Sequence, residues 1–246
     1  SAVFDNDNDD LATAQTNKYR RLADLADIQP GDHVLEIGCG WGGFARYAIE
    51  DRGARVTGIT ISREQHDFAK QRLAEAGLAG RGDVRLIDYR DLDGKFDKIV
   101  SIEMFEAVGE AYWQTYFNAV ASRLKSGGRA ALQAITIEDD AFEEYRREPD
   151  FIQRYIFPGG MLPSMPKLEQ PVAKAGLKLV DERGFGQDYA RTLAEWRERF
   201  QQAWPQLSKD RFDTRFKRMW ELYLSYCEGG FRAGMIDVKH LVYMHR

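Results

Sequence analysis

A glycine-rich turn between a strand pattern and a helix pattern most limits what this chain can fold into. Residues 34–43 read Val-Leu-Glu-Ile-Gly-Cys-Gly-Trp-Gly-Gly. The apolar run before the glycines has the length of a buried strand, and a helical pattern begins near residue 42. Because glycine has no Cβ, the backbone can turn tightly there and a ligand can lie against it. The segment therefore predicts a strand–loop–helix unit that binds a ligand at the loop.

Strand and helix patterns alternate along the rest of the chain, which predicts an α/β fold. Short strands are expected at 33–37, 55–61, 84–87, 98–102, 129–137, 177–183 and 236–244. Helices are expected at about 11–26, from near 42, 62 and 112, and in a block from about 192 to 229. We interpret residues 1–246 as one domain, with a mostly parallel sheet and a helical insertion before the last strand.

Composition narrows the class of protein. The chain has 246 residues, 43% of them hydrophobic and 30% charged, which is enough to build a full core under a charged surface. A net charge of −4 argues against a nucleic-acid binder, because such proteins usually carry a basic excess. The sequence has no apolar run near the roughly 18 residues of a spanning helix, and residues 1–4 do not resemble a signal peptide. Two cysteines give no disulfide framework, so we expect a cytoplasmic protein.

The glycine spacing alone does not identify the ligand. Gly38, Gly40 and Gly43 also satisfy the dinucleotide pattern G-x-G-x-x-G. A dinucleotide site needs an acidic residue about 20 residues further on, at the end of the second strand, to bind the ribose. That stretch is 58–62, Gly-Ile-Thr-Ile-Ser, and it contains no acid. The absence of this acid argues against NAD.

Two other acidic residues favour S-adenosylmethionine (SAM). Glu36 precedes the first glycine by two residues and matches the acidic start of the first methyltransferase motif. Asp88 ends the third strand and is followed by Tyr89, so a carboxylate and a ring are available for the adenine amino group and for stacking. A purely structural turn remains the alternative for the loop.

Longer segments resemble the cyclopropane-fatty-acid synthase family of SAM-dependent methyltransferases, which includes the mycolic acid cyclopropane synthases. The resemblance covers nearly the whole chain and is carried by residues 35–43, 58–65, 101–109, 155–160, 162–164, 188–193 and 215–220. It implies a Rossmann-like class I methyltransferase fold with a mostly parallel seven-stranded sheet. It also implies that the chain begins inside the family pattern, after a segment that covers the cofactor.

The resemblance also implies a cofactor site. The residues that it assigns to SAM are Glu36, Gly38, Gly40, Thr60, Ile61, Gln65, Asp88, Tyr89 and Arg90. Gln65 has an alternative role, because Ser62 and Gln65 have the spacing of a capping box that starts a helix.

For the chemistry, the resemblance implies transfer of the methyl carbon to a double bond of an unsaturated acyl chain. A bound bicarbonate ion is then expected to remove a proton. Its holders correspond to Cys39, Glu106 and Tyr189, and to a position that is usually His and is Gln133 here. A neutral amide holds an anion less tightly than a charged donor, so we expect bicarbonate to bind more weakly. Taken alone, Glu106 could be a helix-start acid and Tyr189 a core aromatic.

The expected substrate is an unsaturated phospholipid or another acyl compound, and the protein is expected to contact the inner face of the membrane transiently. Segments 138–176 and 186–234 are expected to cover its acyl chain. Most of the aromatics at 196, 200, 204, 212, 216 and 220 are expected in the core, and some of them along an acyl tunnel. The basic residues are expected either to meet anionic headgroups or to form a solvated face; they are Lys209, Arg211, Arg215, Lys217 and Arg218.

Some questions stay open at this stage. His66, His240 and His245 have no partners at metal-ligand spacing, so we assign them no role and expect no metal. The sequence leaves a homodimer open. Two further functions are considered: methyl transfer to a nitrogen or oxygen of a small molecule, and SAM binding without catalysis. Cys39, Glu106 and Tyr189 argue against both, because neither function needs them.

Overall fold

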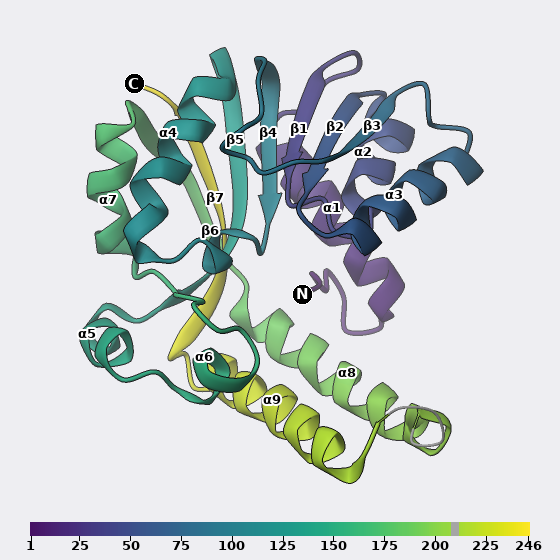
Figure 1. The fold of residues 1–246 in the computed structure, drawn as a ribbon, viewed down its shortest axis with the longest axis vertical. Helices are drawn as coiled ribbons and strands as arrows, with labels where there is room; N and C mark the ends of the chain where they lie inside the picture. The colour runs from purple at the N-terminus through teal and green to yellow at the C-terminus, as the bar shows by residue number, and fades with distance from the viewer. Residues whose placement is uncertain (208–211) are drawn as a thin grey trace.

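The computed structural model describes residues 1–207 and 212–246 and is organised around one seven-stranded sheet (Figure 1). The strands are β1 (His33–Ile37), β2 (Arg55–Thr60), β3 (Gly82–Leu86), β4 (Phe96–Ile102), β5 (Leu124–Ile137), β6 (Leu177–Gly184) and β7 (Ile236–His245). Their order is β3-β2-β1-β4-β5-β7-β6, and β7 runs antiparallel to both of its neighbours. The predicted α/β fold and the mostly parallel sheet are confirmed.

Helices lie on both faces of the sheet and across one of its ends (Figure 1). They are α1 (Leu11–Leu25), α2 (Gly43–Arg52), α3 (Arg63–Glu75), α4 (Trp113–Arg123), α5 (Asp139–Arg147), α6 (Phe151–Tyr155), α7 (Met165–Lys174), α8 (Gly186–Leu207) and α9 (Thr214–Arg232). Two short 3-10 helices, η1 (Phe105–Ala107) and η2 (Glu110–Tyr112), connect β4 to α4.

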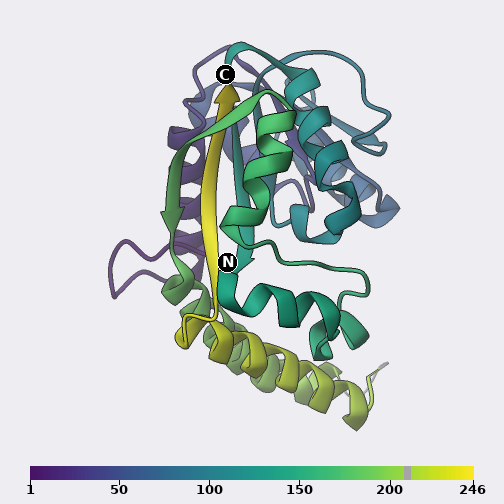
Figure 2. The same ribbon diagram turned by 90° about the vertical axis from the view of Figure 1, so that its left-hand side faces the viewer.

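Successive side chains of β1 lie on opposite faces of the sheet, and they show how the layers form. Val34 packs in a core with α1, α2 and α3, whereas Leu35 packs on the other face with α4 and α7. Successive side chains of a strand point to opposite faces, so one buried strand contributes to both cores. The view along the sheet in Figure 2 shows these layers, with α8 and α9 lying across one end.

The expected element boundaries are mostly within two residues of those in the structure and differ most in two places. β5 starts at Leu124 instead of 129, because Leu124 pairs with Phe96 before a register shift restarts the pairing at Arg129. Gly127 lies in that irregular stretch with φ +75°, a backbone conformation that glycine adopts without strain. The helical block expected at 192–229 consists of two helices, α8 and α9, and α8 begins at Gly186.

The carboxyl ends of the parallel strands face α8, α9 and the short helix α6 (Figure 1). Ser1 is also buried at this end, beside the residue that follows β4. Ligands of open α/β sheets bind at the carboxyl ends of the strands, so this end is where a site is expected. Within residues 1–207 and 212–246, no helix is long and apolar enough to cross a membrane.

Candidate active site

The glycine loop leaves open space beside its backbone. Gly38 and Cys39 both donate their backbone N–H to the Ile59 carbonyl, at 3.0 and 2.9 Å, which ties the loop to β2. Gly40 has φ +52°, and a Cβ placed on it would meet no atom within 4 Å. The glycine is therefore required by its backbone conformation and not by packing, and its exposed face can receive a ligand.

Glu36 is a buried acid with an unsatisfied oxygen. Its side chain is only 2% exposed, and Oε2 has no hydrogen-bond partner among the described residues. Burial raises the pKa of its carboxyl to about 8, although the positive charge of Lys18 and the Ala45 backbone amide oppose the shift. A buried polar atom without a partner suggests a missing ligand. The Glu36 side chain can form hydrogen bonds with the hydroxyl or amino groups of SAM, and its role in cofactor binding stays a prediction.

Thr60, Ile61 and Gln65 lie at the end of β2 and the start of α3. Thr60 Oγ1 donates to Gln65 Oε1 at 2.8 Å, and Ser62 Oγ accepts from the Gln65 backbone N–H at 3.3 Å. Ser62 thus caps α3, but the Gln65 side chain does not return to the Ser62 backbone as a full capping box requires. Ile61 is 78% exposed, so an apolar side chain is available to contact a ligand beside the loop.

Asp88, Tyr89 and Arg90 follow β3. Arg90 donates from Nε and Nη2 to the two oxygens of Asp88, at 2.8 and 2.9 Å. This pairing lowers the pKa of the Asp88 carboxyl, which stays ionised. Tyr89 packs edge-on against Tyr116 with ring centroids 5.5 Å apart. Arg90 is therefore placed to orient Asp88, and the half-buried Tyr89 ring retains an accessible part.

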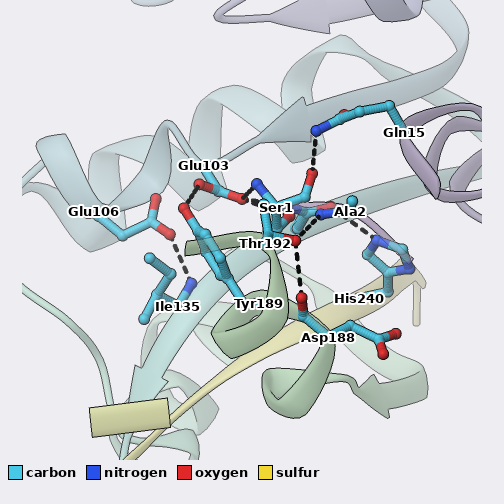
Figure 3. A network of polar contacts seen from close by, with 11 residues as sticks. Ser1, Ala2, Gln15, Glu103, Glu106, Ile135, Asp188, Tyr189, Thr192 and His240 are labelled. Atoms are coloured by element: carbon cyan, nitrogen blue, oxygen red, sulfur yellow. Dashed lines mark hydrogen bonds and ion pairs between the residues drawn. The ribbon is translucent and has the colours of Figure 1, made fainter. Parts of the chain in front are cut away.

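A second polar group surrounds Glu103, the residue directly after β4 (Figure 3). The Tyr189 hydroxyl on α8 donates to Glu103 Oε2 at 2.7 Å. The Gln133 amide on β5 donates to Oε1, and Ser1 Oγ donates to the same oxygen at 2.8 Å. Three donors from distant parts of the chain thus converge on one carboxylate.

Glu103 adopts an uncommon backbone conformation to reach these donors. Its φ is +51°, in the left-handed region that costs a residue with a Cβ about 1–2 kcal/mol. Such strain persists where the surrounding contacts hold the residue in place, and it concentrates at functional sites. The side chain keeps 22% of its surface accessible, so a ligand can reach the carboxylate.

Electrostatics keep the Glu103 carboxylate ionised. Burial alone would raise its pKa, but the charge of Lys18 and the hydrogen bonds from Tyr189 and Ser1 lower it well below its usual value. Lys18 is a buried cation on α1, and it interacts electrostatically with both Glu103 and Glu36. The positive charge of Lys18 therefore acts on two acids at once: Glu36, just before the glycine loop, and Glu103.

Glu106 lies in η1, one turn beyond Glu103. Its Oε1 accepts from the Ile135 backbone N–H at 2.6 Å, whereas Oε2 is buried without a partner among the described residues. Burial and the nearby charge of Glu103 raise the pKa of Glu106 to about 8. Because the pKa of Glu103 is lowered and the pKa of Glu106 is raised, the two carboxyls together hold one proton near neutral pH, and Glu106 carries it.

Of the four residues expected to hold bicarbonate, Gln133, Tyr189 and Glu106 lie around Glu103, and Cys39 lies in the glycine loop. Gln133 and Tyr189 lie together but direct their donors at Glu103. Glu106 has its own contact with Ile135. The Cys39 thiol lies in the glycine loop, where its weak contact is to the Gly40 carbonyl, and burial raises its pKa to about 12.

His240, to which the sequence assigned no role, belongs to this group. It is fully buried on β7 directly opposite Gln133, and its Nε2 contacts Gln133 Oε1 at 2.9 Å. Glu103 is the second residue that sequence reasoning missed. An acid just after a strand is a usable signal, but both Glu103 and Glu106 follow β4, and the family resemblance points to Glu106.

The aromatic and basic residues expected to contact the acyl chain and the headgroups lie in different surroundings. Trp196 and Phe200 on α8 pack with Trp220 on α9, so these aromatics do form a helix–helix core. Arg215 and Arg218 are exposed, whereas Lys217 lies 3.9 Å from Glu221. Lys209 and Arg211, also predicted to meet headgroups, lie outside the described residues.

Known proteins resemble this chain in sequence over most of its length. The family model described as mycolic acid cyclopropane synthetase matches residues 1–241. The tuberculostearic acid methyltransferase UfaA1 of Mycobacterium tuberculosis is 46% identical over 230 residues, covering 93% of this chain and 54% of that protein. The cyclopropane-fatty-acyl-phospholipid synthase of Escherichia coli is 39% identical over 243 residues, covering 99% of this chain and 61% of that protein. The chain thus spans between half and two thirds of the length of these curated relatives.

Solved structures resemble the whole chain. The cyclopropane synthase MmaA2 of Mycobacterium tuberculosis has a TM-score of 0.91 at 29% identity, covering 98% of this chain and 88% of that one. The mycolic acid cyclopropane synthase CmaA1, complexed with SAH and CTAB, gives a TM-score of 0.91 at 28% identity over the same shares. The fold is therefore that of class I SAM-dependent methyltransferases, and the chain belongs to the mycolic acid cyclopropane synthetase family.

Proposed function

We propose that this protein transfers the methyl carbon of SAM to a double bond in the acyl chain of an unsaturated lipid. The product is a cyclopropane ring, or a methyl or methylene branch. Family membership supports the reaction class, and the relatives named above are a fatty acid methyltransferase and a phospholipid cyclopropane synthase. The observation that carries the proposal is the pair of carboxyls, Glu103 and Glu106, near the carboxyl ends of the strands that also hold the glycine loop.

The chemistry explains why such a pair is useful. When bound, SAM supplies an electrophilic methyl group, and Glu36, Gly40 and Gln65 are the residues best placed to hold it. An alkene that forms a bond to this methyl becomes a carbocation. Fixed negative charge stabilises such a cation in a site from which water is excluded. The cation must then lose a proton, so a base is needed within reach.

This requirement argues against the two alternative functions. An amine or phenol that accepts a methyl group keeps its charge on a heteroatom, and one base is enough to remove its proton, so it has no need of two buried carboxyls. A SAM-binding module without catalysis has no need of them either. Glu103 in a strained conformation and Glu106 with an unpartnered oxygen are features of a site that performs chemistry.

Exposed apolar side chains support contact with lipid. They lie on or beside α6 and α9, at the end of the sheet that holds the carboxyls, and are Tyr155, Phe157, Leu222 and Tyr226. Segments 138–176 and 186–234 supply α6 and α9, so we propose that these segments cover the acyl chain and touch the membrane surface. Co-sedimentation with vesicles of a monounsaturated anionic phospholipid tests this, with Tyr155→Ser and Phe157→Ser expected to reduce the bound fraction.

Two measurements test the proposed function. Isothermal titration should show binding of SAM and not of NAD; tighter binding of NAD would overturn the cofactor assignment. Mass spectrometry of lipids from cells that express the full chain should show the gain of one CH2 unit for a ring or a methylene branch, with two further hydrogens for a saturated methyl branch. Unchanged lipids, together with methylated small amines or phenols, would contradict the proposal.

A further inference from the structure

Glu103 has the surroundings that the family resemblance gave to a bound anion. Two of the four residues expected to hold bicarbonate, Gln133 and Tyr189, donate their hydrogen bonds to its carboxylate. Ser1 Oγ adds a third donor. A bicarbonate ion and a carboxylate present the same planar pair of oxygens to such donors. One set of donors cannot satisfy both anions, since each N–H or O–H serves mainly one acceptor.

We propose that the Glu103 carboxylate is the base of the reaction and stands where a bicarbonate ion was expected. This inference rests on the proposed function, because it assumes that a carbocation forms on the substrate. Glu103 is thereby a catalytic residue that the sequence did not identify. Its position beyond the end of β4, its φ of +51° and its three donors all fix one carboxylate in one place.

The proton step balances without an added ion. A C–H bond of the newly added methyl breaks, and its electron pair forms the last bond of the ring. The proton moves to an oxygen of Glu103. If the C–H bond of a neighbouring chain carbon breaks instead, its electron pair forms an alkene within the chain, beside a methyl branch. A methylene branch forms when a hydride first shifts from the methyl-bearing carbon to the cationic carbon, and a C–H bond of the methyl group then breaks to form the C=CH2 bond. A carbocation is so acidic that even a weakly basic carboxylate accepts its proton. The accessible part of Glu103 then allows the proton to leave to solvent.

The hydrogen-bond chain behind Gln133 supports this assignment. Arg21 Nε donates to His240 Nδ1 at 3.2 Å, so the remaining proton of the neutral ring lies on Nε2. His240 Nε2 then donates to Gln133 Oε1, at 2.9 Å. The Gln133 amide can only present its NH2 group to Glu103. An NH2 group held in this orientation suits an acceptor that is always a carboxylate, as the Glu103 side chain is.

Dependence on bicarbonate tests the proposal. Wild type, Glu103→Gly and Glu103→Gln are compared in bicarbonate-depleted buffer, with Glu110→Gln as a control carboxylate on η2 that pairs with Arg146 at the surface. Methyl transfer to vesicles of a monounsaturated phospholipid is measured as bicarbonate is added back. Binding of ¹³C-bicarbonate is followed separately by NMR. Titration with SAM confirms that each variant is folded and binds cofactor.

We expect wild type and Glu110→Gln to turn over equally with and without bicarbonate. Glu103→Gly vacates the donors and relieves the strained φ, so it should lose about 10²–10⁴-fold in turnover and recover when bicarbonate is added. Glu103→Gln fills the same space without charge and should not recover. By NMR, only Glu103→Gly should bind bicarbonate.

Three results would overturn the proposal: loss of wild-type turnover on depletion, near-normal turnover of Glu103→Gly in depleted buffer, or bicarbonate binding by wild type. If no variant methylates lipid although SAM binds, the proposed function fails. The NMR comparison still decides whether Glu103 occupies the place of the anion.

Discussion

Arg21 Nε donates to His240 Nδ1 at 3.2 Å, and this contact determines the orientation of the Gln133 amide, which His240 contacts in turn. Arginine can only donate, so the neutral imidazole must accept at Nδ1 and carry its proton on Nε2. Burial, followed by the charge of Arg21, lowers the pKa of His240 well below its usual value and keeps the ring neutral. Gln133 therefore receives a donor on its oxygen side and turns its NH2 group toward Glu103.

His240→Leu should reduce turnover by allowing the Gln133 amide to turn, while SAM affinity stays close to that of wild type. The variant also leaves a buried Arg21 donor without a partner, which costs about 1–3 kcal/mol of stability. A double-mutant cycle with Gln133→Leu, followed by urea unfolding, should give a coupling energy above about 0.5 kcal/mol. Additive effects would show that the two side chains act independently.

Gly40→Val should abolish SAM binding without unfolding the protein. Its Cβ meets no atom of the chain, so only the left-handed φ of +52° opposes the substitution. Gly77→Val is the matched control, because Gly77 has φ +72° and an equally open Cβ position at the end of α3. Both variants should lose a similar stability, about 1–2 kcal/mol, but only Gly40→Val should lose titratable binding of SAM. Equal SAM affinity in the two variants would place the cofactor elsewhere.

Glu106→Gln should reduce turnover about 10²–10³-fold with little change in SAM affinity, because it removes a fixed negative charge and not the base. The carboxyl ionises near pH 8, and an ionised Glu106 adds negative charge beside the substrate cation. Wild-type turnover should therefore rise through about pH 8, and the variant should lack this rise. Near-normal turnover with an unchanged pH profile would mean that Glu106 only anchors Ile135.

Glu36 should make the unliganded protein less stable as the pH rises. Its pKa is raised from 4.5 to about 8 in the folded state, so the folded protein holds a proton that the unfolded chain releases. The contribution is intact below pH 4.5 and is lost as the pH rises to about 8, by up to roughly 5 kcal/mol at about 1.4 kcal/mol per pKa unit. Urea unfolding between pH 5 and 8 should show a shallower decline for Glu36→Gln than for wild type. Parallel curves would show that Glu36 has an ordinary pKa.

A double variant can restore the site that the resemblance predicted. Glu103→Gly removes the built-in carboxylate, and Gln133→His adds a ring donor that can carry charge. The double variant should saturate at lower bicarbonate than Glu103→Gly alone, whereas Gln133→His alone should stay independent of bicarbonate. If the single and double variants respond identically, residue 133 does not touch the anion.

The fold could be predicted from the sequence because its signals are local. The glycine loop at 38–43 directly follows the apolar run of β1. Ser62 likewise directly precedes the start of α3. The Glu103 group could not be predicted in this way, because its donors come from residues 1, 133 and 189. The choice between Glu103 and Glu106 depends on a single left-handed φ, which no pattern of residue types reveals.

Strand β7 lies between β5 and β6 although it is synthesised after both. A chain still emerging from the ribosome therefore holds two strands that cannot complete the sheet until residues 236–245 arrive. The same strand delivers His240 to Gln133 and Arg21, so β7 must join the sheet before this chain of hydrogen bonds can form. The glycine loop lies between β1 and α2 and does not depend on pairing with β7, so it can form before the Glu103 group is complete.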